Sequence, residues 1–315
     1  MIMEEHKIVS NKKTSLTILR QDLRRNKHIY LIVLPVVVYY FVFHYLPMYG
    51  ALIAFKDFRP SRGVWGSPWV GFKHFTDFFS SYYFARLLKN TLALSVYSLI
   101  FGFPAPIILA LLLNEMQVVW YKRIIQTITY IPHFISIVII CGIIVNFVKM
   151  DGLISLMVSR ISGYDGNLLL EPKYFRTIYV ASGIWQHIGW SSIIYLATLA
   201  GINYELYEAA RIDGAGRWKQ TWYITLPCLL PTITILLILQ LGSLMNVGFE
   251  KVMLLYNPGI YDTADVISTF VYRQGILSAQ YSFSAAVGLF NSVINCTLVV
   301  LANQFSKRMT ENSLW

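Results

Sequence analysis

Apolar residues are concentrated in long runs that short polar segments separate. The runs that reach about 20 residues and contain no Asp, Glu, Lys or Arg lie at 29–55, 91–113, 124–148, 177–202, 222–249 and 283–305. A helix needs about 20 apolar residues to cross a bilayer core, and one charged residue at its centre costs at least about 2.5 kcal/mol. The pattern therefore predicts an all-α integral membrane protein with six transmembrane helices.

The composition supports the same class. Only 13% of the 315 residues are charged and 56% are hydrophobic, whereas a soluble domain carries about 25% charged residues. The net charge of +10 does not indicate nucleic-acid binding, because the basic residues flank apolar runs. The three cysteines lie within apolar runs without a C-x-x-C spacing, which favours buried apolar positions over metal or redox chemistry.

The distribution of Lys and Arg predicts the orientation. Seven of the 26 basic residues precede the first span, and basic segments favour the cytoplasmic side. The bias is modest because the loop 56–89 is also basic. We expect a cytoplasmic segment at 1–28, a transmembrane permease domain at 29–305 and a cytoplasmic tail at 306–315. The first apolar run is too long for a cleavable signal and is expected to remain as an anchor.

The loop between the fourth and fifth spans has strong local signals. Asn203 is a good N-cap, and Gly214 is suited to a left-handed C-cap. Gly216 allows a second change of direction before a new helix continues towards Leu226 and Pro227. The loop 203–221 is therefore predicted to form a short helix, which a glycine hinge joins to a second one.

This loop resembles a motif of importer permeases of the ATP-binding cassette (ABC) class. Their motif reads E-A-A, three residues, G, nine residues, I, one residue, L-P, and this chain matches every position from Glu208 to Pro227. In that family the loop is a coupling helix that docks on a cytoplasmic ATPase. The resemblance implies a type I ABC importer permease fold, with this set of ATPase-coupling residues: Glu208, Ala209, Ala210, Asp213 and Gly214.

Other segments resemble the branch of sugar-importer permeases that handles complex oligosaccharides and polysaccharide fragments. They lie at 45–50, 66–71, 101–106, 130–134 and 255–258. The resemblance implies a heterodimer with a second permease subunit, two ATP-binding cassette subunits and an extracytoplasmic solute-binding protein in the bacterial cell membrane. The chain would form half of the path for an oligosaccharide.

Polar residues within the predicted spans are the candidates for contact with a substrate. Such groups are costly in hydrocarbon and usually face the bundle interior or a cavity. The alternative is hydrogen bonding between helices, worth about 0.6 kcal/mol on average, and the sequence does not separate the two. The predicted substrate path consists of Trp185, Gln186, His187, Gln240, Asn246 and Asn291.

Catalytic and metal-binding patterns are absent from the sequence. There is no H-E-x-x-H pair for zinc and no G-x-x-x-x-G-K-[ST] loop for nucleotide phosphates. We therefore expect a non-catalytic subunit that needs no cofactor of its own, while a partner ATPase uses ATP and Mg²⁺. Three alternatives remain: an ABC importer for a peptide or amino acid, a secondary transporter, and a membrane enzyme. A secondary transporter would be expected to carry charged residues within its spans.

Overall fold

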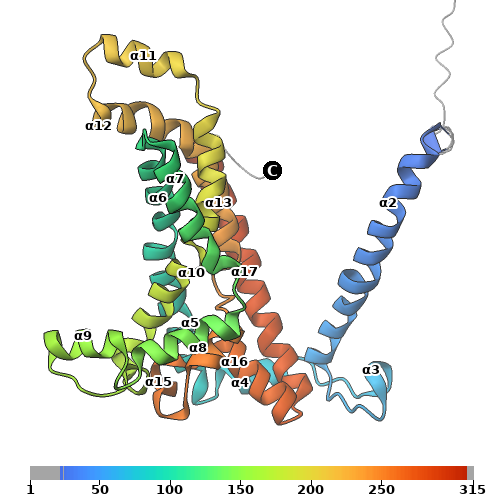
Figure 1. Cartoon of the computed structure of the whole chain (residues 1–315). Coiled ribbons are helices and arrows are strands. Elements are labelled where there is room, and N and C mark those ends of the chain that lie inside the picture. The colour runs from blue at the N-terminus through green and yellow to red at the C-terminus, as the bar shows by residue number, and fades with distance from the viewer. Residues whose placement is uncertain (1–21, 24, 311–315) are drawn as a thin grey trace, which may run out of the picture. The chain divides into compact units, whose positions relative to one another are not determined.

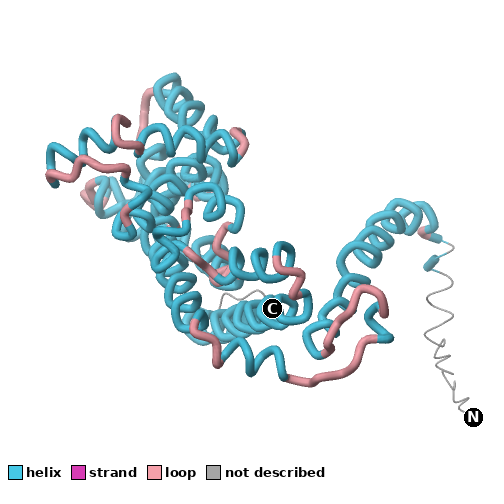
Figure 2. The backbone as a smooth tube through the Cα atoms, turned by 90° about the horizontal axis from the view of Figure 1, so that it is seen from below, coloured by secondary structure: helices cyan, strands magenta, loops and turns pink. Residues whose placement is uncertain are grey.

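The computed structural model describes residues 22, 23 and 25–310 of the chain. Most of the predicted N-terminal segment and residues 311–315 of the predicted tail lie outside the described residues. The chain divides into two units, Met1–Leu52 and Ile53–Trp315, and each is considered by itself. The described residues form helices and loops (Figure 2), and their only extended pairing is an isolated bridge between Lys56 and Trp69. The all-α prediction is confirmed.

The described residues of the first unit form mainly an apolar helical segment. Helix α2 spans Lys27–Tyr40, and a π-helical turn, η1 (Phe41–Tyr45), follows it directly. The 3-10 helix η2 (Leu46–Phe55) continues the helical run into the second unit. No residue of α2 is buried within the chain. Because a helix satisfies its own backbone polar groups, such a segment can lie in hydrocarbon without a partner strand or loop.

The second unit contains the remaining helices (Figure 1). Those before the long helix α10 are α3 (Gly63–Gly66), α4 (Lys73–Phe79), α5 (Tyr83–Tyr97), η3 (Ser98–Gly102), α6 (Pro104–Glu115), α7 (Val119–Tyr130), η4 (Ile131–Phe134), α8 (Ile137–Val148), α9 (Leu153–Ser162) and η5 (Leu168–Leu170). From α10 onwards they are α10 (Pro172–Ala200), α11 (Tyr204–Ile212), α12 (Arg217–Gln220), η6 (Thr221–Thr225), α13 (Leu226–Gly242), α14 (Phe249–Leu255), η7 (Pro258–Ile260), α15 (Tyr261–Ala264), α16 (Ile267–Tyr272), η8 (Arg273–Leu277) and α17 (Tyr281–Thr310).

Five helical segments of the described residues are long and apolar enough to cross a membrane. They are Lys27–Phe55, Tyr83–Glu115, Ile137–Ser162, Arg217–Gly242 and Tyr281–Arg308. Helix α10 has 29 residues but is not among them. It carries Trp185, Gln186 and His187, whose polar groups lower the mean hydropathy of the helix. The predicted count of six is therefore not confirmed by length and composition.

The predicted third span, 124–148, is interrupted in the structure. Helix α7 ends at Tyr130, and η4 carries Pro132, which has no N–H to donate. Ile135 and Ser136 then adopt extended conformations, with ψ of 135° and 141°. The chain changes direction there, so that α7 packs on α10 whereas α8 packs on α14. The predicted run thus forms two helices, and only the second belongs to a segment that is long and apolar enough to cross a membrane, Ile137–Ser162.

Buried side chains form three clusters in the second unit. One joins α8, α10, α14 and α15, a second joins α4, α5, α16 and α17, and a third joins α6, α10 and α13. Gly189 allows α10 to approach α7 closely, because a Cβ atom there would lie 2.2 Å from the Thr129 carbonyl oxygen. Small residues at helix contacts are typical of membrane bundles. Helix α10 is therefore the central element around which the cavity described below is built.

Candidate functional site

The loop 203–221 folds as its local signals predict. The Asn203 side chain accepts a hydrogen bond from the Glu205 backbone N–H at 3.1 Å and so caps α11. A side-chain cap satisfies one of the backbone donors that a helix leaves unpaired at its N-terminus. Glu205 also lies in the first turn, where a negative charge is favourable. The predicted N-terminus of the helix is confirmed.

Gly214 ends α11 in the predicted left-handed conformation, with φ of +74°. Its N–H donates to the Arg211 carbonyl at 3.0 Å, and the Ala215 N–H donates to the Ala210 carbonyl at 2.8 Å. This pair of bonds is the Schellman arrangement, which satisfies carbonyls that the helix end leaves free. Gly216 then precedes α12, which runs into η6 and α13. The predicted sequence of helix, glycine hinge and second helix is thus present.

Few side-chain contacts connect the loop 203–221 to the helix bundle. The hydroxyls of Tyr207 and Thr225 lie 3.0 Å apart and join α11 to the start of the fifth predicted span, where Thr225 is buried. The Gln220 side-chain amide donates to the Ala215 carbonyl at 2.7 Å and braces the hinge. Figure 1 shows α11 and α12 beyond the ends of α6, α7 and α13. The loop can therefore be reached by a large partner.

The motif residues lie on this accessible helix. Glu208, Ala209, Asp213 and Gly214 are exposed, and Ala210 is half-buried. The side chain of Glu208 forms no ion pair or hydrogen bond within the part of the chain that is described. Ile212 is 87% exposed although it is strongly apolar. An uncommitted carboxylate beside exposed apolar side chains is typical of a surface that another protein covers.

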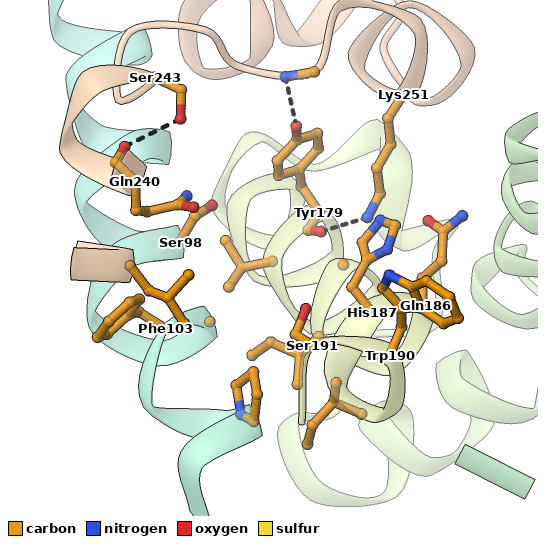
Figure 3. A pocket seen from close by; sticks show the side chains of 18 of the residues that line it. Ser98, Phe103, Tyr179, Gln186, His187, Trp190, Ser191, Gln240, Ser243 and Lys251 are labelled. Carbon is orange, nitrogen blue, oxygen red and sulfur yellow. Dashed lines mark hydrogen bonds between the residues drawn. The ribbon is translucent and has the colours of Figure 1, made fainter. Parts of the chain in front are cut away.

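A cavity of about 1170 Å³ lies in the second unit (Figure 3). Its wall comes from the turn η3 with the start of α6, one face of α10, the end of α13 and the start of α14. The lining combines apolar side chains with hydroxyl, amide, imidazole and indole groups. Such a mixture can bind a ligand that has both apolar faces and many hydrogen-bonding groups.

Three of the six predicted path residues line this cavity: Gln186 and His187 from α10, and Gln240 from α13. Gln186 is 4% exposed, and its Oε1 has no hydrogen-bond partner among the described residues. His187 lies with its Nδ1 3.1 Å from Nδ1 of His133, whose ring stacks on Trp190 at 4.6 Å between centroids. Trp185 is 43% exposed and does not line the cavity.

The other two predicted residues, Asn246 and Asn291, form a separate cluster. Oδ1 of Asn246 accepts hydrogen bonds from the side-chain amides of Asn291 and Asn295, each at 3.0 Å. Asn295 in turn accepts from the Met245 backbone N–H at 2.9 Å. Neither predicted residue lines the cavity. In this structure the cluster joins α17 to the segment after α13, which corresponds to the alternative of hydrogen bonding between helices.

Sequence reasoning missed Lys251, which also lines the cavity. Its ammonium donates to the Tyr179 backbone carbonyl at 2.8 Å, while the Tyr179 hydroxyl accepts from the Gly248 N–H at 3.1 Å. Burial lowers the pKa of Lys251 to about 8. A lone lysine just beyond an apolar run would have been a usable signal, but it resembles any basic flank.

The described residues contain no group of three or more His, Cys, Asp and Glu side chains that could hold a metal ion. The site thus consists of an accessible helical loop and a cavity of mixed polarity. This combination suits a membrane subunit that binds a solute and docks on another protein.

Comparison with known families decides the class. Residues 102–311 match the family described as the binding-protein-dependent transport system inner membrane component. The chain belongs to this family. It is a multi-pass membrane permease subunit of an ABC transporter with the type I fold, and not a catalytic subunit.

Similar proteins agree over almost the full length. Protein LplB of Bacillus subtilis (strain 168) is 46% identical over 93% of this chain and 92% of its own. The polygalacturonan/rhamnogalacturonan transport system permease protein YteP of the same organism is 43% identical over 92% and 91%. A chain of a bacterial ABC transporter involved in the import of the acidic polysaccharide alginate is 45% identical, with a TM-score of 0.86 over 93% of this chain and 99% of that one.

Proposed function

We propose that this chain is the permease subunit of an ATP-driven, binding-protein-dependent importer of oligosaccharides or polysaccharide fragments. It pairs with a second permease subunit, two ATPase subunits and an extracytoplasmic solute-binding protein. The partner ATPase uses ATP and Mg²⁺. The chain lies in the bacterial cell membrane with both termini in the cytoplasm, which places the loop 203–221 on the same side as the ATPase.

The single observation that carries the coupling role is the display of the motif on α11. Glu208 is exposed and its carboxylate has no partner within the described chain. The Schellman turn at Gly214 and the Tyr207–Thr225 contact connect this helix to α13. A force applied to α11 by a partner is therefore passed to a helix that forms part of the cavity wall. Movement of a rigid helix between two arrangements is a common way to couple two sites.

The cavity supports an oligosaccharide as cargo. Sugars present apolar faces that pack on aromatic rings, and hydroxyls that exchange hydrogen bonds. The cavity offers Trp190 and Phe103 for the first purpose, and Gln186, Ser191 and Gln240 for the second (Figure 3). The similar transporter chain serves alginate, and the similar permease is described for polygalacturonan and rhamnogalacturonan. All three are polysaccharides, which supports the same substrate class here.

The test is Glu208→Lys in the complete transporter, reconstituted in proteoliposomes with its binding protein. Reversal of an interface charge leaves a buried repulsion. We expect ATPase stimulation by the loaded binding protein and oligosaccharide uptake to fall at least about tenfold. Asp77→Lys is the matched control, because this exposed carboxylate lies outside the loop and, like Glu208, forms no ion pair within the described chain. Normal uptake by the Glu208 variant would refute coupling through α11. Failure of the wild type to transport any oligosaccharide would refute the proposed cargo.

A further inference from the structure

The cavity contains a buried cation that no carboxylate of the described chain neutralises. Lys251 is only 7% exposed, and no ion pair of the described residues includes it. Its ammonium makes one hydrogen bond, to the Tyr179 carbonyl, and stands 4.8 Å from the centroid of the Tyr179 ring. An ammonium has three N–H donors. Two donors are therefore available to a group that enters the cavity.

The ammonium lies at the cavity wall, where α14 packs closely against α10. Gly183 lies opposite it on α10, and a Cβ atom at that position would be 3.3 Å from Nζ. Figure 3 shows the amino group directed at the Tyr179 carbonyl beside the ring of His187. A charge held in a buried site without a counter-ion is costly. The hydrogen bond to Tyr179 and the contact with its ring offset part of that cost, and a further acceptor at the ammonium would offset more of it.

The groups beside Lys251 suit a sugar rather than a simple inorganic anion. Gln186, three residues after Gly183 and so about one turn further along α10, has a buried Oε1 without a partner in the described chain. Such an atom normally accepts a hydrogen bond, and a sugar hydroxyl can donate one. Trp190 is 46% exposed and lines the same cavity. An acidic sugar combines the carboxylate, the hydroxyl and the apolar face that these residues would contact.

Glu250, a second charged residue of the cavity lining, can be compared directly with Lys251. Glu250 precedes Lys251 in α14 and lines the same cavity, but it is exposed and forms no ion pair with Lys251. A carboxylate repels an acidic ligand, whereas an ammonium attracts it. The two neighbours should therefore act on an acidic sugar with opposite signs. A purely structural effect would not produce that pattern.

We propose that Lys251 is a specificity-determining residue that binds a carboxylate of an acidic oligosaccharide in this cavity, with Gln186 accepting from a hydroxyl of the same ligand. This inference rests on the proposed function. The ligand is defined by its chemistry: a short chain of uronic acid residues, in which carboxylates repeat along a sugar backbone.

The experiment measures uptake by the complete transporter in proteoliposomes with its binding protein. The probes are oligogalacturonate and oligoalginate pentasaccharides, the length bound by the periplasmic protein of a similar transporter, and the same chains with their carboxyl groups methyl-esterified. Rates for each variant are divided by the wild-type rate for the same probe, so that a preference of the binding protein cancels. The variants are Lys251→Met, Lys251→Arg and Glu250→Gln, and the exposed Lys149→Met is the control.

We expect Lys251→Met to lower uptake of an acidic probe by about tenfold, since a hydrogen bond between charged groups is worth about that factor or more. Uptake of the ester should change little. Lys251→Arg should retain most of the acidic uptake, and Glu250→Gln should raise it. If the wild type transports no ester, the contrast between the Met and Arg variants carries the test.

Equal loss of acidic and esterified uptake in Lys251→Met would overturn the proposal and leave a structural role. Unchanged acidic uptake would overturn it as well. A wild-type transporter that accepts only neutral oligosaccharides would refute the acidic ligand while the proposed function stands. A transporter that takes up no oligosaccharide at all would refute both.

Discussion

The loop 203–221 and the cavity differ in how their residues are brought together. The loop is built from consecutive residues, and its two bonds at the hinge join positions three and five apart in sequence. The cavity is built from η3, α10, α13 and α14, whose residues are as far apart as Ser98 and Lys251. A site built from neighbouring residues can therefore be predicted from the sequence, whereas a site formed by packing depends on how the helices approach each other.

The largest expected effect concerns the packing that forms the cavity. Gly189→Ala would place a Cβ atom against the Thr129 carbonyl, which the backbone of α7 holds in position. Overpacking of this kind costs about 1–3 kcal/mol, occasionally more. The thermal unfolding temperature of the purified transporter should fall, and substrate uptake should fall with it. Gly288→Ala is the matched control, since a Cβ atom there meets nothing within 4 Å. Equal stability of the two variants would contradict the close approach of α7 and α10.

A smaller effect is expected in the loop, where the strain is local. Gly214→Ala would force an L residue to φ of +74°, which costs about 1–2 kcal/mol. Hydrogen exchange of the amides of α11 should become faster, and ATPase stimulation should decrease, while the unfolding temperature changes little. Gly216→Ala tests the same loop without the strain, because Gly216 has φ of −68° and open space around it. Matching behaviour of both variants would show that the Schellman turn is not what orients the helix.

The smallest expected effect separates the two polar clusters of the predicted path. Asn246→Ala removes the acceptor of two hydrogen bonds, each worth about 0.6 kcal/mol in a membrane bundle. Stability should fall by about 1 kcal/mol, with an unchanged KM for oligosaccharide uptake. Gln186→Ala should instead raise KM with little change in stability, because Gln186 lines the cavity and its Oε1 is unpartnered within the described chain. The reverse pattern would assign Asn246 to the path.

Much of the fold follows from patterns that the sequence carries openly. The absence of charge from long apolar runs predicted a helical membrane protein, and Asn203 and Gly214 predicted the two ends of α11. The prediction was weaker where one apolar run forms two separate helices, α7 and α8. Residues 124–148 contain Pro132, but proline is tolerated in many membrane helices. Only the extended conformation of Ile135 and Ser136 shows that the chain turns there.

The predicted path illustrates the same limit at single residues. Trp185, Gln186 and His187 are consecutive in one helix, so they point in different directions about 100° apart. Two of them line the cavity and Trp185 does not. Asn246 and Asn291 are as polar as Gln240, but the Asn291 amide donates to Asn246, while the Oδ1 of Asn291 has no partner among the described residues. Polarity within a span predicts that a group must be satisfied, and packing decides whether a helix or a ligand satisfies it.

The sequence by itself determined the membrane class, the helical content and the geometry of the loop, because these depend on hydropathy and on bonds between residues close along the chain. The tertiary structure alone decided which polar groups share the cavity, and it brought Lys251 of α14 against Tyr179 of α10. Those contacts join residues 72 positions apart. No local preference specifies such a pair, since it arises only when the helices pack and exclude solvent from the space between them.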